Sequence, residues 1–298
     1  QEAVATAISS ADIMATAVGV PILPRIAPNI ARGLQKRWQS GNFTPLNLII
    51  CENLIDADKY LKKLVLAELD EEQNKTFDDC VGFVEASVGR MVPVMTEAMQ
   101  DGNPLRVLVE PYCRLPVDKD GFKGEIPDIK NMIPASPFAF YIQRKLYIHN
   151  LGHALLAYIG QAKGYHYIWE AVRDPAVRRV VRAGMTASAQ ALAQEHDQEL
   201  APILEHVEDL LFRFNNRQLG DTVERVGRDI PRKLSPEDRL VGAMNLCIRH
   251  GIDPSAIVLG IEAALACARI TEKSLQTVAF DDETWQALRA LSGQIWDH

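Results

Sequence analysis

The first third of the chain alternates between short apolar runs and one amphipathic stretch. ADIMATAVGV (residues 11–20) and PLNLIIC (45–51) are typical of buried strands, and LPRIAPNIARGLQKRW (23–38) has the period of an amphipathic helix. This order predicts a βαβ unit, which normally belongs to a parallel sheet covered by helices. Two strands cannot bury both faces of such a sheet. The candidates for further strands are VGFVEASVGRMVP (81–93) and LRVLVEPYCRLPV (105–117).

From residue 136 onward the pattern changes to helices. Proline follows an N-cap residue at four predicted helix starts, which are Ser136, Asp174, Ser235 and Asp253. The first of these helices is expected to run from Pro137 to about Lys163. The sequence therefore predicts the remainder of a Rossmann-type α/β domain over residues 1–135 and a mainly α-helical domain over residues 136–298.

The glycine-rich GxGxxG segment that cradles the pyrophosphate in most Rossmann domains does not occur in the 298 residues. We therefore expect the sequence to begin partway through a nucleotide-binding domain, and the chain by itself to be inactive. The residue that distinguishes NAD from NADP follows the second strand of such a domain and is expected to lie in the missing part, so the choice between the two cofactors stays open.

The composition is that of a globular protein with one large or two medium domains, because 47% of the residues are hydrophobic and 24% are charged. No long apolar run and no signal-peptide pattern occurs, which predicts a cytoplasmic protein that does not bind a membrane. A formal net charge of -7 speaks against nucleic acid as a partner. The five cysteines are scattered without a CxxC pair, as reduced core residues would be. The oligomeric state stays open.

Four polar residues interrupt the apolar helical run RKLYIHNLGHALLAY (144–158), namely Lys145, His149, Asn150 and His153. At about 100° per residue, Lys145, Asn150 and His153 fall within an arc of roughly 140°, so they can line one wall of a cleft. Oxidation of an alcohol by hydride transfer needs a base for the hydroxyl proton and donors for the oxygen. A lysine with a lowered pKa can be the base, an amide can donate to the oxygen, and an imidazole can hold a substrate hydroxyl.

Spacing alone leaves two other interpretations of these residues open. In one, Lys145 extends its ammonium group to solvent and the histidines are hydrogen-bonded core residues. In the other, His149 and His153 form an i, i+4 pair of zinc ligands, although no third ligand or neighbouring glutamate is evident.

The spacing K-x4-N-x2-H of Lys145, Asn150 and His153 resembles the signature of the polyol-specific long-chain dehydrogenases, a family that includes mannitol dehydrogenases and hexuronate reductases. Five further segments resemble, in the same order, the matching segments of the mannitol-1-phosphate 5-dehydrogenases of this family. They are CENLIDADKYLKKLV, VGFVEASVGRMVP, VEPYCRLPVDKDGFKGEIPDI, NLGHALLAYIGQAKGY and DTVERVGRDIPRKLSPEDRL. The resemblance covers most of residues 11–260. It implies a Rossmann-type domain, NAD as the cofactor and a reaction without a metal.

The resemblance also implies catalytic roles. Lys145 would be the acid/base, Asn150 and Asn53 would form the oxyanion-type site, and His153 would orient the substrate. These four residues are expected to converge on one cleft, although Asn53 is far from the others in the sequence.

The implied cofactor contacts lie in the first half of the chain. Ala17, Val18 and Gly19 would approach the dinucleotide after a Rossmann strand, because small residues let a cofactor come close to the backbone. Glu52 would contact it from the C-terminal end of the next strand, where open α/β sheets bind ligands. A solvated carboxylate is an equally good explanation of Glu52.

A cluster of cations in ERVGRDIPRKL bears on the substrate. Arg232 and Lys233, with Arg228 and Lys123, are expected to bind a phosphate group of the sugar. A hexuronate carboxylate could use the same cations, and a solvated face with ion pairs would need no ligand. Together with these cations, the resemblance implies the interconversion of mannitol 1-phosphate and fructose 6-phosphate with NAD. The alternatives are a tagaturonate or fructuronate reductase, a mannitol 2-dehydrogenase, and a catalytically silent helical interaction protein.

Overall fold

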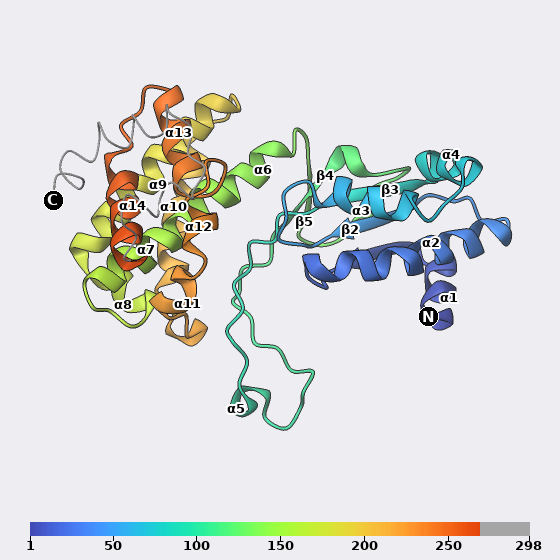
Figure 1. The fold of residues 1–298 in the computed structure, drawn as a ribbon, viewed down its shortest axis with the longest axis horizontal. Coiled ribbons are helices and arrows are strands. Elements are labelled where there is room, and N and C mark those ends of the chain that lie inside the picture. The colour runs from blue at the N-terminus through green and yellow to red at the C-terminus, as the bar shows by residue number, and fades with distance from the viewer. Residues whose placement is uncertain (269–298) are drawn as a thin grey trace. The chain divides into compact units, whose positions relative to one another are not determined.

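The computed structural model describes residues 1–268 and divides the chain into two compact units (Figure 1). The first unit consists of Gln1–Arg90 and Pro111–Ile142, and the second consists of Met91–Glu110 and the chain from Gln143 onward. The units therefore interleave along the sequence, whereas the predicted boundary near residue 135 treats each domain as one continuous segment. The end of the predicted helical domain, residues 269–298, lies outside the described residues.

The first unit contains the predicted βαβ arrangement. Within residues 1–268, its main sheet has three parallel strands in the order β1 (Ile13–Thr16), β2 (Leu46–Ile50) and β3 (Val81–Glu85). The predicted helix between the first two strands is α2 (Leu23–Gln39). All residues of the central strand β2 are buried, whereas β1 is buried only at Thr16. The other edge strand, β3, is buried at every position except Glu85.

The two faces of this sheet have different cover. One face packs against a core from α1 (Glu2–Ser10), α2, α3 (Ala57–Leu66) and α4 (Glu71–Cys80). On the other face, Ile49 and Val84 pack against Val117, which belongs to a small parallel sheet of β4 (Leu115–Asp118) and β5 (Met132–Ala135). The described part of the first unit is therefore an α/β domain with parallel sheets, as predicted.

The predicted strands over residues 81–93 and 105–117 are wrong in their extent. Only Val81–Glu85 and the residues from Leu115 onward form ladders, and β5 was not predicted. The Met91 amide donates to the Glu110 carboxylate at 2.5 Å instead of to a neighbouring strand. Pro93 lacks an amide donor and cannot continue a ladder. The intervening segment contains the short helix α5 (Glu97–Gln100) and belongs to the second unit.

The second unit is mainly helical. Its helices follow α6 (Ala139–Arg144) and are η3 (Lys145–Asn150), α7 (Leu151–Ala162), α8 (Ile168–Arg173), α9 (Pro175–Glu195), α10 (Leu200–Phe214), α11 (Val223–Gly227), α12 (Ile230–Lys233), α13 (Val241–Arg249) and α14 (Ser255–Ala268). Single 3₁₀ turns occur at η1 (Val20–Ile22) and η2 (Lys119–Gly121) in the first unit and at η4 (Arg217–Leu219) in the second. None of the helices in residues 1–268 combines the length and the apolar character that a bilayer crossing requires.

Helix α7 is the centre of the second unit and is surrounded by α8, α9, α11 and α14 (Figure 1). Its sequence is apolar on nearly all sides, as in helices that are buried all round. Glycines allow the close packing. A Cβ added at Gly152 would lie 2.5 Å from Met185 Sδ on α9, and one at Gly160 would lie 2.7 Å from Ala171 Cβ on α8.

Two of the four predicted helix starts are confirmed. Helix α9 begins at Pro175, and the Asp174 carboxylate accepts from the next two free amides. Helix α14 begins at Ser255, where the Asp253 carboxylate accepts from the Ser255 amide at 2.9 Å.

The other two predicted starts are wrong. The Ser136–Pro137 bond is cis and α6 begins only at Ala139, because the Ser136 hydroxyl donates to Asp120 at 2.5 Å rather than capping a helix. Residues 234–240, which include Pro236, form turns, and α13 begins at Val241. All five cysteines are free, but Cys113 is exposed rather than in a core.

Candidate functional site

Lys145 and Asn150 are the first and last residues of η3, a π-helical turn between α6 and α7. A π-helix joins residue i to residue i+5, so these two residues are one π-turn apart. The predicted continuous α-helix from Pro137 to Lys163 is therefore wrong at this point. The angle between the lysine and the asparagine around the helix axis is therefore smaller than it would be in an α-helix. Short π-helical turns of this kind are frequent at functional sites.

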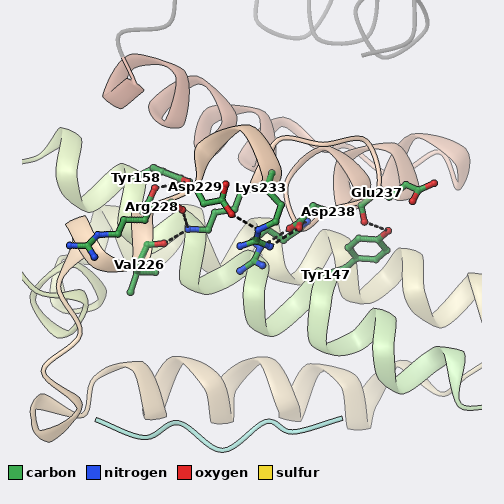
Figure 2. A network of polar contacts seen from close by, with 11 residues as sticks. Tyr147, Tyr158, Val226, Arg228, Asp229, Lys233, Glu237 and Asp238 are labelled. Atoms are coloured by element: carbon green, nitrogen blue, oxygen red, sulfur yellow. Dashed lines mark hydrogen bonds and ion pairs between the residues drawn. The ribbon is translucent and has the colours of Figure 1, made fainter. Parts of the chain in front are cut away.

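Tyr147 holds the π-turn from two sides. Its carbonyl accepts a hydrogen bond from the Ser188 hydroxyl of α9 at 2.6 Å. Its own hydroxyl donates to the Glu237 carbonyl at 3.3 Å (Figure 2). Ser188 is fully buried, so the first contact fixes the backbone of the turn within the core of the second unit.

Lys145 is partly buried in this unit. Its burial lowers the pKa of the ammonium group below the ordinary value, and the Arg239 guanidinium lowers it further. Both effects disfavour the charged form, because burial removes water from it and a like charge repels it. A lysine with a lowered pKa can accept a proton at a pH where a solvated lysine is fully charged.

His153 lies on α7, three positions beyond the end of the π-turn. Its ring stacks on Phe214 at a centroid distance of 5.1 Å. Its Nε2 lies 3.2 Å from Asp221 Oδ2, without the geometry of a hydrogen bond. Burial, followed by the charges of Arg225, Arg239 and Lys233, lowers the pKa of His153 to about 3. The lowered pKa favours the neutral ring at physiological pH, and Nε2 is a buried atom that has no hydrogen-bond partner among the described residues.

The zinc interpretation of His149 and His153 finds little support among residues 1–268. The ring centroids lie 6.4 Å apart, and His149 packs its buried ring edge-to-face against Phe214. In this part of the chain, no group of three His, Cys, Asp or Glu side chains is arranged to hold a metal ion. Metal independence of the reaction itself stays a prediction.

Residues 225–239, which we call the basic segment, are tied to α7 through Lys233 and Tyr158 (Figure 2). Lys233 is 6% exposed, and its ammonium group donates to the Val226 and Arg228 carbonyls. It also lies 6.0 Å from the centroid of the Tyr158 ring. Burial, then Arg239 and Arg232, lower the pKa of Lys233 to about 8. The lysine therefore holds the backbone of the basic segment.

The other predicted phosphate ligands differ in their surroundings. Arg232 donates through Nε to Asp229 at 2.5 Å and through Nη1 to Asp238 at 3.0 Å. Arg228 is exposed, 3.7 Å from Glu224. Three of the four predicted ligands belong to the basic segment of the second unit, and Lys123 belongs to the first unit.

Arg239 is a candidate site residue that the sequence did not single out. Asp238 Oδ1 accepts from its Nε at 2.7 Å and from its backbone amide at 2.6 Å. Its positive charge lowers the pKa of Lys145, His153 and Lys233. The residue follows the quoted cluster ERVGRDIPRKL by a few positions, and extending that cluster through SPEDRL would have included it.

The loop after β1 is built around Glu52 in the first unit. The amides of Val18 and Gly19 each donate to one oxygen of the Glu52 carboxylate, both at 2.8 Å. Gly19 has a φ of +87°, which favours glycine, and a Cβ there would meet no atom within 4 Å. Glu52 is buried, so its interpretation as a solvated carboxylate is wrong. Ala17 precedes these amides and is exposed.

Two buried polar atoms at the same sheet edge have no hydrogen-bond partner among the described residues. They are Thr16 Oγ1, at the C-terminal end of β1, and Glu85 Oε1, at the C-terminal end of β3. Burial, then Asp58 and Asp56, raise the pKa of Glu85 to about 7. Open α/β sheets bind ligands at this edge, and the hydroxyl and amide groups of a dinucleotide could satisfy such atoms. The residues present therefore fit a dinucleotide.

The site residues thus fall into two groups. Lys145, Asn150 and His153 belong to the second unit, and Asn53 belongs to the first with the residues around Glu52. The convergence of Asn53 with the other three stays a prediction.

The chain combines a parallel α/β domain whose carboxyl edge is polar with a helical domain that carries a lysine, an amide and an imidazole, which is the arrangement predicted for a two-domain dehydrogenase. The chain belongs to the mannitol dehydrogenase family. Residues 1–131 match the mannitol dehydrogenase Rossmann domain, and residues 138–296 match the mannitol dehydrogenase C-terminal domain.

Two solved structures have a similar fold. A D-sorbitol dehydrogenase in substrate-free form has a TM-score of 0.74 and 17% identity, and the match covers 97% of this chain and 68% of that one. The Pseudomonas fluorescens mannitol 2-dehydrogenase in a ternary complex with NAD and D-mannitol has a TM-score of 0.64 and 19% identity, covering 98% and 66%. The chain therefore spans about two thirds of the length of these two proteins.

Proposed function

We propose that the protein is an NAD-dependent oxidoreductase that interconverts a sugar alcohol phosphate and a ketose phosphate, with mannitol 1-phosphate and fructose 6-phosphate as the first candidates. The observation that carries the proposal is the partly buried Lys145, whose pKa is lowered, one π-turn from Asn150. Membership of the mannitol dehydrogenase family supports a polyol substrate. The complex of the mannitol 2-dehydrogenase with NAD and D-mannitol supports the cofactor.

In the oxidation direction, the neutral Lys145 amine takes the proton of the substrate hydroxyl onto Nζ. The Asn150 amide donates to the same oxygen as negative charge develops on it, and Asn53 is proposed to add a second donor. His153, which is neutral, accepts or donates a hydrogen bond at a neighbouring substrate hydroxyl and so orients the carbon chain. In the reduction direction, the protonated lysine returns the proton to the carbonyl oxygen.

The dinucleotide is proposed to lie at the carboxyl edge of the first unit's sheet. Ala17, Val18 and Gly19 would offer it close backbone contact, because their loop is exposed and Gly19 has open space around it. Glu52 would fix this loop through the two amides it accepts. When bound, NAD supplies the acceptor for the hydride that leaves the alcohol carbon.

The phosphorylated substrate is proposed from the charge of the basic segment. Three predicted phosphate ligands, Arg228, Arg232 and Lys233, lie in it, and Lys123 is proposed to contribute from the first unit. A hexuronate reductase would use the same cations for a carboxylate, and a mannitol 2-dehydrogenase would not need them. A silent interaction protein would have no use for a lysine held in a partly buried position with a lowered pKa.

An assay of the full-length protein with NADH separates these functions. We expect turnover with fructose 6-phosphate to exceed turnover with fructose, tagaturonate and fructuronate. Preference for either uronate would identify a hexuronate reductase, and preference for fructose would identify an enzyme of free polyols. Absence of NADH oxidation with all four would contradict the proposed function.

A further inference from the structure

Arg239 differs from the neighbouring cations in the hydrogen-bond donors that it leaves open. Lys233 directs its ammonium group at two main-chain carbonyls, and Arg232 uses Nε and Nη1 on two carboxylates. Arg239 uses its Nε on Asp238, and no hydrogen bond or ion pair of its Nη groups occurs among residues 1–268. Its side chain is 12% exposed, so these donors are largely shielded from water but remain reachable.

The position of Arg239 within the second unit connects it with the proposed reaction site. The charge of its guanidinium acts on Lys145, His153 and Lys233, which are all residues of the same unit. The hydrogen-bond partners of Lys233 are neutral carbonyls, and the carboxylates of Asp229 and Asp238 offset its positive charge only in part. Open donors beside a second cation are suited to an anion with several acceptor oxygens.

The guanidinium of Arg239 is also well supported. Asp238 Oδ1 accepts a hydrogen bond from Arg239 Nε and Oδ2 accepts one from Arg232 Nη1, so the carboxylate is fixed through both of its oxygens. Figure 2 shows this network, in which the Tyr147 hydroxyl binds the Glu237 carbonyl next to Asp238. The turn that carries Arg239 is thus attached to the π-turn that carries Lys145. A binding group held in this way loses little entropy when a ligand arrives.

We propose that Arg239 binds the phosphate group of the substrate through its open Nη donors, and that Asp238 is the positioning residue that aims the guanidinium. The inference rests on the proposed function and names the residue that selects the substrate class, a phosphate monoester of an open-chain sugar. Arg232 and Lys233 then contribute by holding the basic segment. A planar guanidinium can bind two phosphate oxygens at once, which a lysine cannot do.

The test compares variants of the full-length protein in NADH-dependent reduction of fructose 6-phosphate and of fructose. Arg239→Gln should lower kcat/KM for fructose 6-phosphate by roughly 10- to 100-fold, mainly through KM, because hydrogen bonds to charged groups contribute on this scale. When the variants are compared at a pH low enough for Lys145 to be protonated in all of them, the kcat/KM for fructose should change by less than about threefold. Arg239→Lys keeps a positive charge beside Asp238, so the fold should be preserved. It should lower the kcat/KM for fructose 6-phosphate less than Arg239→Gln does, and it should likewise spare fructose.

Arg249→Gln is the matched control, because Arg249 is an exposed arginine of the same unit that lies 3.3 Å from Glu195 and outside the network. It should leave both substrates unaffected. Equal losses with fructose 6-phosphate and fructose in both Arg239 variants, or no loss with either, would overturn the inference. A wild type that reduces fructose but not fructose 6-phosphate would also overturn it, while leaving a polyol oxidoreductase in place.

Thermal unfolding with inorganic phosphate separates failure of this inference from failure of the proposed function. Phosphate should raise the Tm of the wild type and of Arg249→Gln, and it should raise the Tm of Arg239→Gln markedly less. If the wild type reduces none of the sugars, the proposed function fails, and a selective loss of phosphate protection would still support an anion site at Arg239. An equal Tm rise in all three proteins, or no rise in the wild type, would overturn that site.

Discussion

The buried ion pair between Glu110 and Arg213 gives the sharpest prediction about stability, because it ties Met91–Glu110 to the helical unit. Glu110 Oε1 accepts from Arg213 Nη2 at 2.5 Å and Oε2 accepts from Arg213 Nε at 2.9 Å. The Glu110 and Arg213 side chains are 2% and 6% exposed. Oε1 also accepts from the Met91 amide, so one carboxylate fixes both ends of this segment.

Glu110→Gln keeps the shape but replaces one acceptor oxygen by an amide donor that faces the guanidinium. Asp209, whose Oδ2 lies 3.3 Å from Arg213 Nη1, then remains as a carboxylate partner. Removing one member of a buried ion pair leaves an uncompensated charge, which costs about 3–5 kcal/mol. Glu208→Gln is the matched control on α10, because its partner Arg182 and Glu208 itself are both exposed. Such a pair contributes less than about 1 kcal/mol.

The assay is urea unfolding of the full-length protein, followed by circular dichroism. The helical unit should unfold in Glu110→Gln at a clearly lower urea concentration than in the wild type, and Glu208→Gln should follow the wild type closely. The reasoning is refuted if both variants shift the midpoint equally, because the Glu110–Arg213 pair would then contribute no more than an exposed one.

Three further predictions concern the reaction. In the oxidation direction the rate should rise with pH as Lys145 loses its proton. Arg239→Gln should move this rise to higher pH, because removal of a nearby cation lets the pKa of Lys145 rise. A rise at an unchanged or lower pH would contradict this. Glu52→Gln leaves one of the Val18 and Gly19 amides without an acceptor, so the Kd for NADH, measured by fluorescence titration, should rise by roughly five- to tenfold, and an unchanged Kd would argue against this loop as a cofactor contact. Activity should survive EDTA, since a lysine takes the proton; a loss that zinc restores would revive the metal interpretation.

The sequence predicted the α/β unit well where the pattern was strong. Leu46–Ile50 is an uninterrupted apolar run and forms a fully buried central strand, and the amphipathic stretch before it is α2. The prediction failed where a side chain takes the place of a backbone carbonyl as the hydrogen-bond acceptor. Residues after Glu85 have a β-like composition, but the Glu110 carboxylate takes up the Met91 amide, a long-range contact that no local pattern indicates.

The site could be predicted only in part for the same reason. The spacing of Lys145, Asn150 and His153 identified the helical group, but a period of 3.6 residues cannot reveal that the first two span a π-turn. The roles of Asn53 and Glu52 were predicted from resemblance and strand position, and they stay predictions. Arg239 was missed, because its relation to Lys145 depends on how the turn at 234–240 folds back onto the π-turn through the Tyr147 hydroxyl.

The most direct test of the central claim is the turnover number of Lys145→Met in the full-length protein, measured with NAD and mannitol 1-phosphate. Methionine keeps most of the stem of this partly buried side chain, so packing is preserved while the proton acceptor is lost. The account predicts a kcat lower by on the order of 10²-fold or more, normal binding of NAD, and loss of the pH-dependent rise seen in the wild type. A kcat within about threefold of the wild type, under conditions where a deuterated substrate shows hydride transfer to limit the rate, would contradict it.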